Sequence, residues 1–248
     1  FEEDPVRSLR AIRFVNKLGF KLDNQVKDAI YDKGHLLADI SNARLFDEFC
    51  KIFLNGMAEK NFLKLCSFKL NRHLILSDPN KSDFSNNVMI QALRNTDDRV
   101  KNDQSITPGF LMAALLWPTL LAKCSKNGEI NIRKFFRSMD GVLREQQKLT
   151  AVPRKFSSYI KDIWVLQLKL HSRIASQPYK TLRHPRFRAA YDFLLVREKA
   201  AGDKNGLGKW WTDFQKDDDS LRGTIIANMN EKNEEESSKI FGFYNELR

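Results

Sequence analysis

The sequence predicts an all-α protein, a multi-helix array of roughly ten helices joined by short connections. Three observations support this fold class. Apolar residues recur at helical spacing along most of the chain, whereas the alternation of β-branched residues typical of strands is almost absent. Signals for helix ends are frequent, and the segments between them are short. The chain contains no internal repeat and no low-complexity linker.

The individual helices follow from their end signals in chain order. Asp4 is a candidate N-cap and Pro5 a candidate first residue of a helix that ends before Gly19. Asn55 and Gly56 form a good C-terminal pair for a later helix, and Pro108 opens another. The predicted helices cover residues 5–18, 24–31, 42–54, 58–68, 86–99, 108–121, 130–149, 154–171, 184–199 and 209–215.

Composition limits the class of protein. With 248 residues, 42% of them hydrophobic and 29% charged, the chain can bury a real core. Its longest apolar run, 110–121, contains a proline and falls short of the ~20 residues that cross a bilayer, so no membrane partner is expected. The three cysteines, Cys50, Cys66 and Cys124, are too few and too widely spaced for a disulfide framework or a zinc site, and they favour a reducing cytoplasm.

Positive charge is concentrated in one block. Within 133–188 only Asp140, Glu145 and Asp162 oppose the many lysines and arginines, so this block alone carries as much charge as the +11 of the whole chain. Its basic residues alternate with aromatic residues, which favours a nucleic acid as the partner. The alternative is an ordinary solvated helix surface. After Gln215 the sequence turns acidic, and we assign that segment no role.

The first predicted helix carries a cationic stripe. Arg7, Arg10, Arg13 and Lys17 fall within an arc of about 120°, and residues 11, 12, 14, 15 and 18 form an apolar face that we expect to pack on the body. Guanidinium groups spaced in this way suit a phosphate or a base edge, and a nearby carboxylate such as Asp4 would add acceptors. The alternatives are a salt-bridged surface for the stripe and helix capping for Asp4.

Residues 2–14, EEDPVRSLRAIRF, resemble the EDxxRxLRAxRF signature of class II nucleotidyltransferases, the bacterial poly(A) polymerases and the tRNA CCA-adding enzymes. The resemblance implies that Asp4 and Arg7 read the base of the incoming nucleotide and that Arg10 and Arg13 help to hold it. ATP is then the substrate nucleotide.

A second match follows in the chain. Residues 43–48, ARLFDE, resemble the ARLFEE helix that braces this segment, which implies a structural role for Arg44 and Glu48. Their i, i+4 spacing also suits a local ion pair.

Later motifs distinguish the bacterial poly(A) polymerases from the CCA-adding enzymes. They resemble the body and leg of bacterial poly(A) polymerase, and they lie at 95–100, 108–117, 153–155, 163–167, 184–194 and 210–215. The resemblance implies a neck at 1–56, a body at 57–150 and an RNA-binding leg at 151–215. It does not extend to 216–248, which we leave as a tail of unknown role.

Within the predicted leg, RNA-binding candidates fall in two places. Arg154 and Lys155 open a helix, where backbone N–H groups also attract phosphate. The others form a compact cationic group beside Phe187 and Tyr191, whose rings could stack on bases. This group is Arg183, His184, Arg186 and Arg188. The alternative for Phe187 and Tyr191 is a place in the helix core, where we expect Phe193 and Trp164 to lie.

The sequence lacks the catalytic part of such an enzyme. In this family, carboxylates of a mixed α/β head bind Mg²⁺, and neither a Gly-Ser pair nor a strand with a DxD motif occurs here. We assign the aspartates at 217–219 to solvated charge, and we assign no catalytic or metal-binding residue. The chain begins with Phe1 and is expected to continue a catalytic head that it lacks, so it should be inactive alone.

We therefore expect the RNA-binding and ATP-base-recognising portion of a polynucleotide adenylyltransferase that acts on RNA 3′ ends. The first alternative is the same region of a CCA-adding enzyme, for which the complete protein would add CTP as well as ATP to tRNA. The second is a standalone helical RNA-binding module, for which the native reading frame would begin near Phe1.

Overall fold

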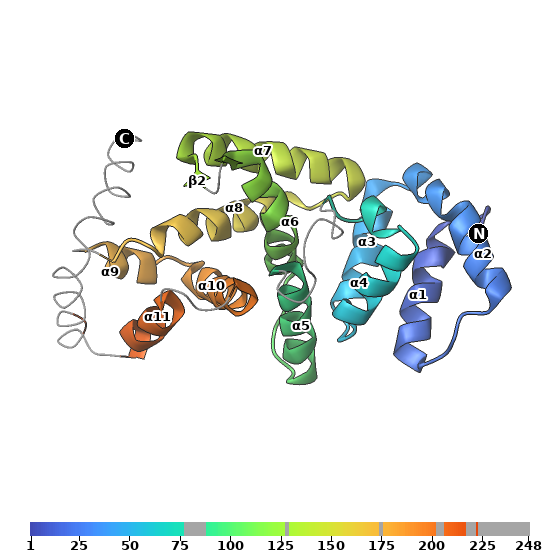
Figure 1. Cartoon of the computed structure of the whole chain (residues 1–248), viewed down its shortest axis with the longest axis horizontal. Helices are drawn as coiled ribbons and strands as arrows, with labels where there is room; N and C mark the ends of the chain where they lie inside the picture. The colour runs from blue at the N-terminus through green and yellow to red at the C-terminus, as the bar shows by residue number, and fades with distance from the viewer. Residues whose placement is uncertain (77–87, 127–128, 174–175, 202–205, 217–221, 223–248) are drawn as a thin grey trace. The chain divides into compact units, whose positions relative to one another are not determined.

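The computed structural model describes residues 1–76, 88–126, 129–173, 176–201, 206–216 and 222. It confirms the all-α fold class (Figure 1). The described residues form two units, Phe1–Ser158 and Tyr159–Arg248, with the boundary inside α8. The finer division into neck, body and leg stays a prediction, and the acidic segment after residue 216 lies outside the described residues.

The described residues of the first unit form seven α-helices, two 3₁₀ helices and one pair of two-residue strands, and the unit ends within an eighth α-helix. These elements are α1 (Val6–Leu18), α2 (Asn24–Lys33), η1 (Gly34–Asp39), α3 (Asn42–Phe53), α4 (Ala58–Ser67), η2 (Asn71–His73), α5 (Val88–Lys101), α6 (Pro108–Cys124), β1 (Ser125–Lys126), β2 (Glu129–Ile130), α7 (Ile132–Leu149) and the start of α8 (Arg154–Lys169). β1 and β2 pair antiparallel, with Ser125 opposite Ile130. The 3₁₀ helices and this short hairpin have no counterpart among the predicted elements.

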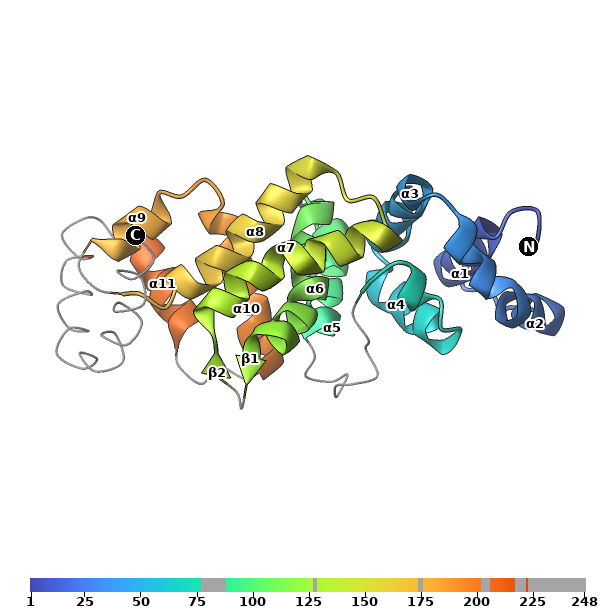
Figure 2. The same ribbon diagram turned by 90° about the horizontal axis from the view of Figure 1, so that it is seen from above.

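α1, α3 and α4 lie side by side around an aromatic core (Figure 1, Figure 2). Phe49, Phe53 and Phe62 are fully buried there. The ring centroids of Phe49 and Phe53 are 4.8 Å apart, and those of Phe53 and Phe62 are 6.4 Å apart. The left-handed conformation of Gly19, at φ 70°, ends α1 where the sequence predicted. These contacts set the position of α1 relative to α3, on which the candidate site depends.

The expected apolar face of α1 is wrong in its second half. The structure buries Val6, Leu9 and Ile12 but leaves Phe14 48% and Leu18 54% exposed. The helical wheel itself gives the reason: at 100° per residue, Phe14 and Leu18 lie about 20° on either side of Arg7, whereas Leu9 and Ile12 lie about 160° and 140° from it. Phe14 and Leu18 therefore share the cationic side, and on the buried side Asn16 donates from Nδ2 to Oδ1 of the buried Asn61 at 2.8 Å.

The remainder of the first unit is organised around α6, which is hydrophobic on nearly all sides and packs against α5 and α7. The buried amide of Gln146 in α7 ties this part to the loop after η2. It donates to the carbonyl oxygen of Leu74 at 2.8 Å and accepts from the backbone N–H of Leu76 at 2.9 Å. Among the described residues, none of the helices is long and apolar enough to cross a membrane.

The second unit contains the remainder of α8 with α9 (Gln177–Leu182), α10 (Phe187–Ala201) and α11 (Leu207–Lys216). Its core includes Leu166, Leu170 and three aromatic residues of α11, namely Trp210, Trp211 and Phe214. Gly208 permits the close approach of α10 and α11, because a Cβ there would lie 2.7 Å from Leu195. Two predictions needed correction: α9 was not expected, and α10 begins at Phe187 rather than at residue 184.

Candidate functional site

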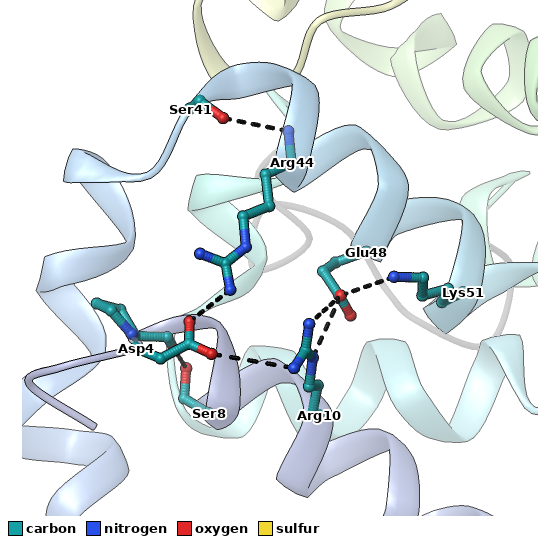
Figure 3. Close-up of polar contacts among 8 residues, drawn as sticks. Asp4, Ser8, Arg10, Ser41, Arg44, Glu48 and Lys51 are labelled. Carbon is teal, nitrogen blue, oxygen red and sulfur yellow. Dashed lines mark hydrogen bonds and ion pairs between the residues drawn. The ribbon is translucent and has the colours of Figure 1, made fainter.

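The carboxylate of Asp4 is held by arginines from two helices rather than by the end of its own helix (Figure 3). Arg44 of α3 donates from Nη2 to Oδ1 at 2.8 Å, and Nη1 of Arg10 lies 3.9 Å from Oδ2. The N-cap of α1 is Pro5, without a side-chain cap, so the predicted capping by Asp4 is wrong. The Asp4 side chain is only 20% exposed, and its ion pairs with Arg44 and Arg10 fix its orientation.

Arg10 is fixed in turn by Glu48 of α3. It donates from Nε and Nη2 to Oε1 of Glu48 at 3.3 Å and 3.2 Å, and Lys51 donates to the same oxygen at 3.0 Å (Figure 3). The Glu48 side chain is 1% exposed, and its second oxygen is buried without a hydrogen-bond donor from the described residues. The expected local pair of Arg44 with Glu48 is replaced, because Arg44 pairs with Asp4 just before α1 and Glu48 pairs with Arg10 on α1.

Arg7 and Arg13 of the predicted stripe lie in different surroundings. Arg7 is exposed, one turn after Asp4, and its backbone N–H donates to the Asp4 carbonyl oxygen at 3.0 Å. Arg13 is partly buried, with its guanidinium carbon 4.8 Å from the ring centroid of Phe14. α1 therefore offers a fixed carboxylate beside an exposed guanidinium at its start, and a shielded cation farther along.

The predicted RNA-binding residues fall in both units. Arg154 and Lys155 are exposed in the first turn of α8, within the first unit, and Lys155 Nζ lies 5.0 Å from the ring centroid of Phe156. A helix N-terminus with two exposed cations can accept a phosphate.

The other four candidates lie between α9 and the first turn of α10, in the second unit. Arg183 is exposed and ends α9, and His184 Nδ1 accepts from the backbone N–H of Arg186 at 3.1 Å. The guanidinium of Arg186 lies 4.9 Å from the ring centroid of Tyr159. Arg188 pairs with Asp192 at 3.1 Å. The cations are thus at the surface, as an RNA contact requires.

The two aromatic residues that were predicted to stack on bases beside these cations lie in the core instead. Phe187 and Tyr191 are each 6% exposed and belong to the core of the second unit, so the prediction that their rings stack on bases is wrong. Phe193 and Trp164 are fully buried, which confirms their assignment to the core. Tyr159, half-buried under Arg186, is the aromatic residue that the sequence interpretation missed.

Lys51 was also missed, although its i, i+3 spacing from Glu48 was a visible signal. Tyr159 had no comparable signal, because it is 27 residues from Arg186 in the sequence and meets it only in the folded unit.

Two models of known protein families match the chain. Residues 19–79 match the family model described as "Probable RNA and SrmB- binding site of polymerase A". Residues 127–240 match the one described as "Polymerase A arginine-rich C-terminus". Together the two models cover more than half of the chain.

Individual relatives agree with the family models. Poly(A) polymerase I of Escherichia coli O157:H7 is 35% identical over 226 residues, which is 87% of this chain and 49% of the relative. Poly(A) polymerase I of Haemophilus influenzae is 34% identical over 91% of this chain and 52% of the relative.

A CCA-adding enzyme of Bacillus cereus (strain G9842) is 42% identical, but over only 30% of this chain and 19% of the relative. The chain spans about half the length of the poly(A) polymerases it matches. It belongs to the poly(A) polymerase family, of which it carries the helical C-terminal region.

Proposed function

We propose that this chain is the RNA-binding and ATP-base-recognising part of a polynucleotide adenylyltransferase, which adds AMP from ATP to RNA 3′ ends. The observation that carries the proposal is the carboxylate of Asp4, held at 2.8 Å by Arg44 beside the exposed Arg7. The matches to poly(A) polymerases support the same function.

The chemistry of adenine suits this pair of side chains. The Watson–Crick edge of adenine has an amino donor beside a ring-nitrogen acceptor, and proteins read such edges through hydrogen bonds. Asp4 would accept from the amino group, and Arg7 would donate to the ring nitrogen. Arg44 and Arg10 would hold the carboxylate in place, and Arg10 and Arg13 would complete the nucleotide-binding set. Guanine and uracil have a carbonyl and an N–H at these positions, so the pair discriminates against them.

RNA would be bound by the exposed cations at the start of α8 and between α9 and α10. Each can neutralise a backbone phosphate without reading sequence. These residues are Arg154, Lys155, Arg183, His184, Arg186 and Arg188. The three cysteines, none of which is in a disulfide, fit a cytoplasmic location.

Nucleotidyl transfer itself needs metal ions, and the described residues contain no group of carboxylates, imidazoles or thiols that could hold one. We propose that Mg²⁺ and the transfer chemistry belong to a separate catalytic head in the complete enzyme. The part of the reaction assigned to this chain is the selection of ATP and the retention of RNA.

The test compares nucleotide choice with RNA binding in the complete enzyme that contains this region. Arg7→Ala should reduce the preference for ATP over GTP and UTP, while the Kd for RNA changes little. The matched control is Lys60→Gln, which removes an exposed cation of α4. Unchanged nucleotide choice together with a lower Tm would contradict the proposal and make Arg7 a structural residue.

A second candidate function, the same region of a CCA-adding enzyme, is favoured by the 42% identity over 74 residues. Cytosine presents the same amino group and ring nitrogen as adenine, so the Asp4 and Arg7 pair is compatible with both. Incorporation of CTP as well as ATP on a tRNA by the complete enzyme would establish this alternative. Incorporation of ATP alone on an RNA 3′ end would exclude it.

A further inference from the structure

The long helix α7 has two sides of opposite character. One side packs on α6 and α3 (Figure 2), and its buried residues are Phe135, Met139, Val142, Leu143 and Gln146. On the opposite side, four exposed cations lie within an arc of about 80° on the helical wheel. They are Lys134, Arg137, Arg144 and Lys148. The row is about 21 Å long, and it lies in the first unit, on a helix that carries none of the predicted RNA-binding residues.

The fold does not neutralise this row. None of the ion pairs among the described residues includes any of its four cations. Two carboxylates occur within α7. Glu145 pairs with Lys123 of α6, and Asp140 lies one turn from Arg137 and from Arg144 but forms an ion pair with neither. Like charges one turn apart on a helix repel each other, so the row favours an anion from outside the fold.

A glycine lies in the middle of the row. Gly141 is in the interior of α7, where glycine is less favourable than alanine because it loses more backbone freedom on folding. Packing does not require it, since a Cβ at this position would have no atom within 4 Å. Its neighbours on the same side of the helix, one and two turns away in both directions, are the four cations. Gly141 therefore leaves a stretch of helix backbone uncovered between positive charges, where a ligand can approach closely.

We infer that this side of α7 binds the phosphodiester backbone of RNA. One phosphate lies over Gly141 between Arg137 and Arg144, and the phosphates that flank it lie at Lys134 and Lys148. Arginine donates to a phosphate through two parallel N–H groups, and lysine acts as a point charge. Contacts to phosphates position a strand without reading its bases, so the site has no sequence preference.

The inference rests on the proposed function for the class of ligand. An even row of cations suits a polymer that carries a charge at every residue, which favours RNA over an acidic protein segment. The phosphates belong to a single strand or to a double-stranded part of the RNA, because both have the same backbone chemistry. The inference adds a site to the predicted RNA-binding residues and uses none of them.

The test measures binding of fluorescein-labelled probes to the 248-residue chain by anisotropy across a salt series. The probes are a single-stranded oligoadenylate, an RNA hairpin and polyglutamate. The variant is Arg137→Gln with Arg144→Gln. The matched control is Lys60→Gln with Lys101→Gln, which removes the same charge from exposed positions of α4 and α5. Circular dichroism of both variants verifies that the fold is intact.

The expected result for the α7 variant is a loss of about tenfold in affinity for at least one RNA, beyond any loss in the control. For a single strand, the slope of log K against log salt should also fall by about 0.7 for each phosphate released, and so by up to about 1.4 for two. Loss for the hairpin alone assigns the site to double-stranded RNA. Equal behaviour of variant and control towards both RNAs would overturn the inference, and loss of polyglutamate binding alone would make the face a protein contact.

A second variant, Gly141→Gln, tests the close approach at the glycine. Glutamine favours helix, carries no charge and covers the exposed backbone, so RNA affinity should fall about threefold or more while the urea midpoint does not fall. Unchanged affinity, or a loss of affinity that accompanies a lower urea midpoint, would overturn the phosphate position over Gly141.

The predicted RNA-binding residues of the second unit are tested separately by replacing Arg183, Arg186 and Arg188 together with alanine. If this triple variant keeps its affinity and salt slope while the α7 variant loses both, the residues named in the proposed function are wrong and the α7 site stands. The opposite pair of results keeps the proposed residues and removes the α7 site. Absence of RNA binding by the unmodified chain overturns the inference, whereas nucleotide choice in the Arg7→Ala enzyme still tests the base-reading part of the proposed function.

Discussion

Replacing Glu48 by glutamine tests whether the charge network between α1 and α3 holds the first helix in place. Glutamine keeps the shape of the side chain but removes the charge that Arg10 and Lys51 share. In Glu48, the second carboxylate oxygen is buried and has no hydrogen-bond partner among the described residues. The glutamine amide would place an N–H₂ group near that position. The substitution therefore weakens two ion pairs and buries a donor.

The magnitude follows from the distances and the burial. At an effective dielectric constant of about 20, the attraction between Arg10 and Glu48 across 3.2 Å is roughly 5 kcal/mol. The desolvation of a carboxylate that is only 1% exposed offsets several kcal/mol of this. Arg10 and Lys51 are 39% and 48% exposed, so both regain water when the charge is lost. The free energy of unfolding should therefore fall by about 1–3 kcal/mol, the range for leaving a buried polar group unsatisfied.

The assay is urea unfolding of the chain, followed by hydrogen-exchange mass spectrometry on peptides from α1 and α3. These peptides report the first unit separately from the second. The matched control is Glu145→Gln, which breaks an exposed ion pair with Lys123 and should cost less than about 1 kcal/mol. A loss for Glu48→Gln no larger than that of the control, or a gain in stability, would refute the argument that this network positions α1.

Three further predictions follow from other contacts. Burial raises the pKa of Asp97, whose carboxylate accepts from two backbone N–H groups at the start of α4. The contribution of Asp97 to stability should thus be greatest below the ordinary pKa of 3.8 and decline as the pH rises through the raised value, whereas asparagine does not titrate. Urea titrations should therefore show the stability of Asp97→Asn relative to the unmodified chain rising from pH 3 to pH 7, and a relative stability that falls or stays level would contradict this. Replacing Arg183, Arg186 and Arg188 together by alanine should flatten the salt slope of RNA binding by up to ~2 units with unchanged circular dichroism, whereas an unchanged slope would move the RNA path to α8. Burial and the nearby Asp47 raise the pKa of Cys50 to about 11, so at pH 8 iodoacetamide should label it about a hundredfold more slowly than a thiol of pKa 9.0, and peptide mass spectrometry showing equal rates would contradict this.

The sequence predicted the helices well where their ends have local chemical causes. Gly19 ends α1 through a left-handed conformation, and Ser41 caps α3 by accepting from the backbone N–H of Arg44 at 3.4 Å. Both effects act over a few residues and are visible in a short window. α9 has six residues and no side-chain cap, so its one local signal was Pro178 in the first turn, and the helix was missed.

The candidate site was only partly predictable, because its contacts join residues far apart in the sequence. The motif identified Asp4, Arg10, Arg44 and Glu48, but the i, i+4 rule paired the last two with each other. In the structure Arg44 reaches Asp4, 40 residues away, and Glu48 reaches Arg10, 38 residues away. A rule that considers one helix cannot find a partner that tertiary packing brings to it.

Because a single-helix rule omits tertiary partners, it also cannot distinguish the roles of the cations in the stripe. On an isolated helix, Arg7, Arg10 and Arg13 are equivalent positions of a cationic face. Packing against α3 and α4 makes them different: Arg10 is neutralised by Glu48, Arg7 stays exposed, and Arg13 is shielded beside a cavity without a carboxylate. A positive charge that the fold neutralises acts on the structure, whereas one that the fold leaves unneutralised is available to a ligand. We therefore propose that Arg10 serves the nucleotide-binding set by orienting Asp4, and that Arg7 and Arg13 contact the nucleotide directly.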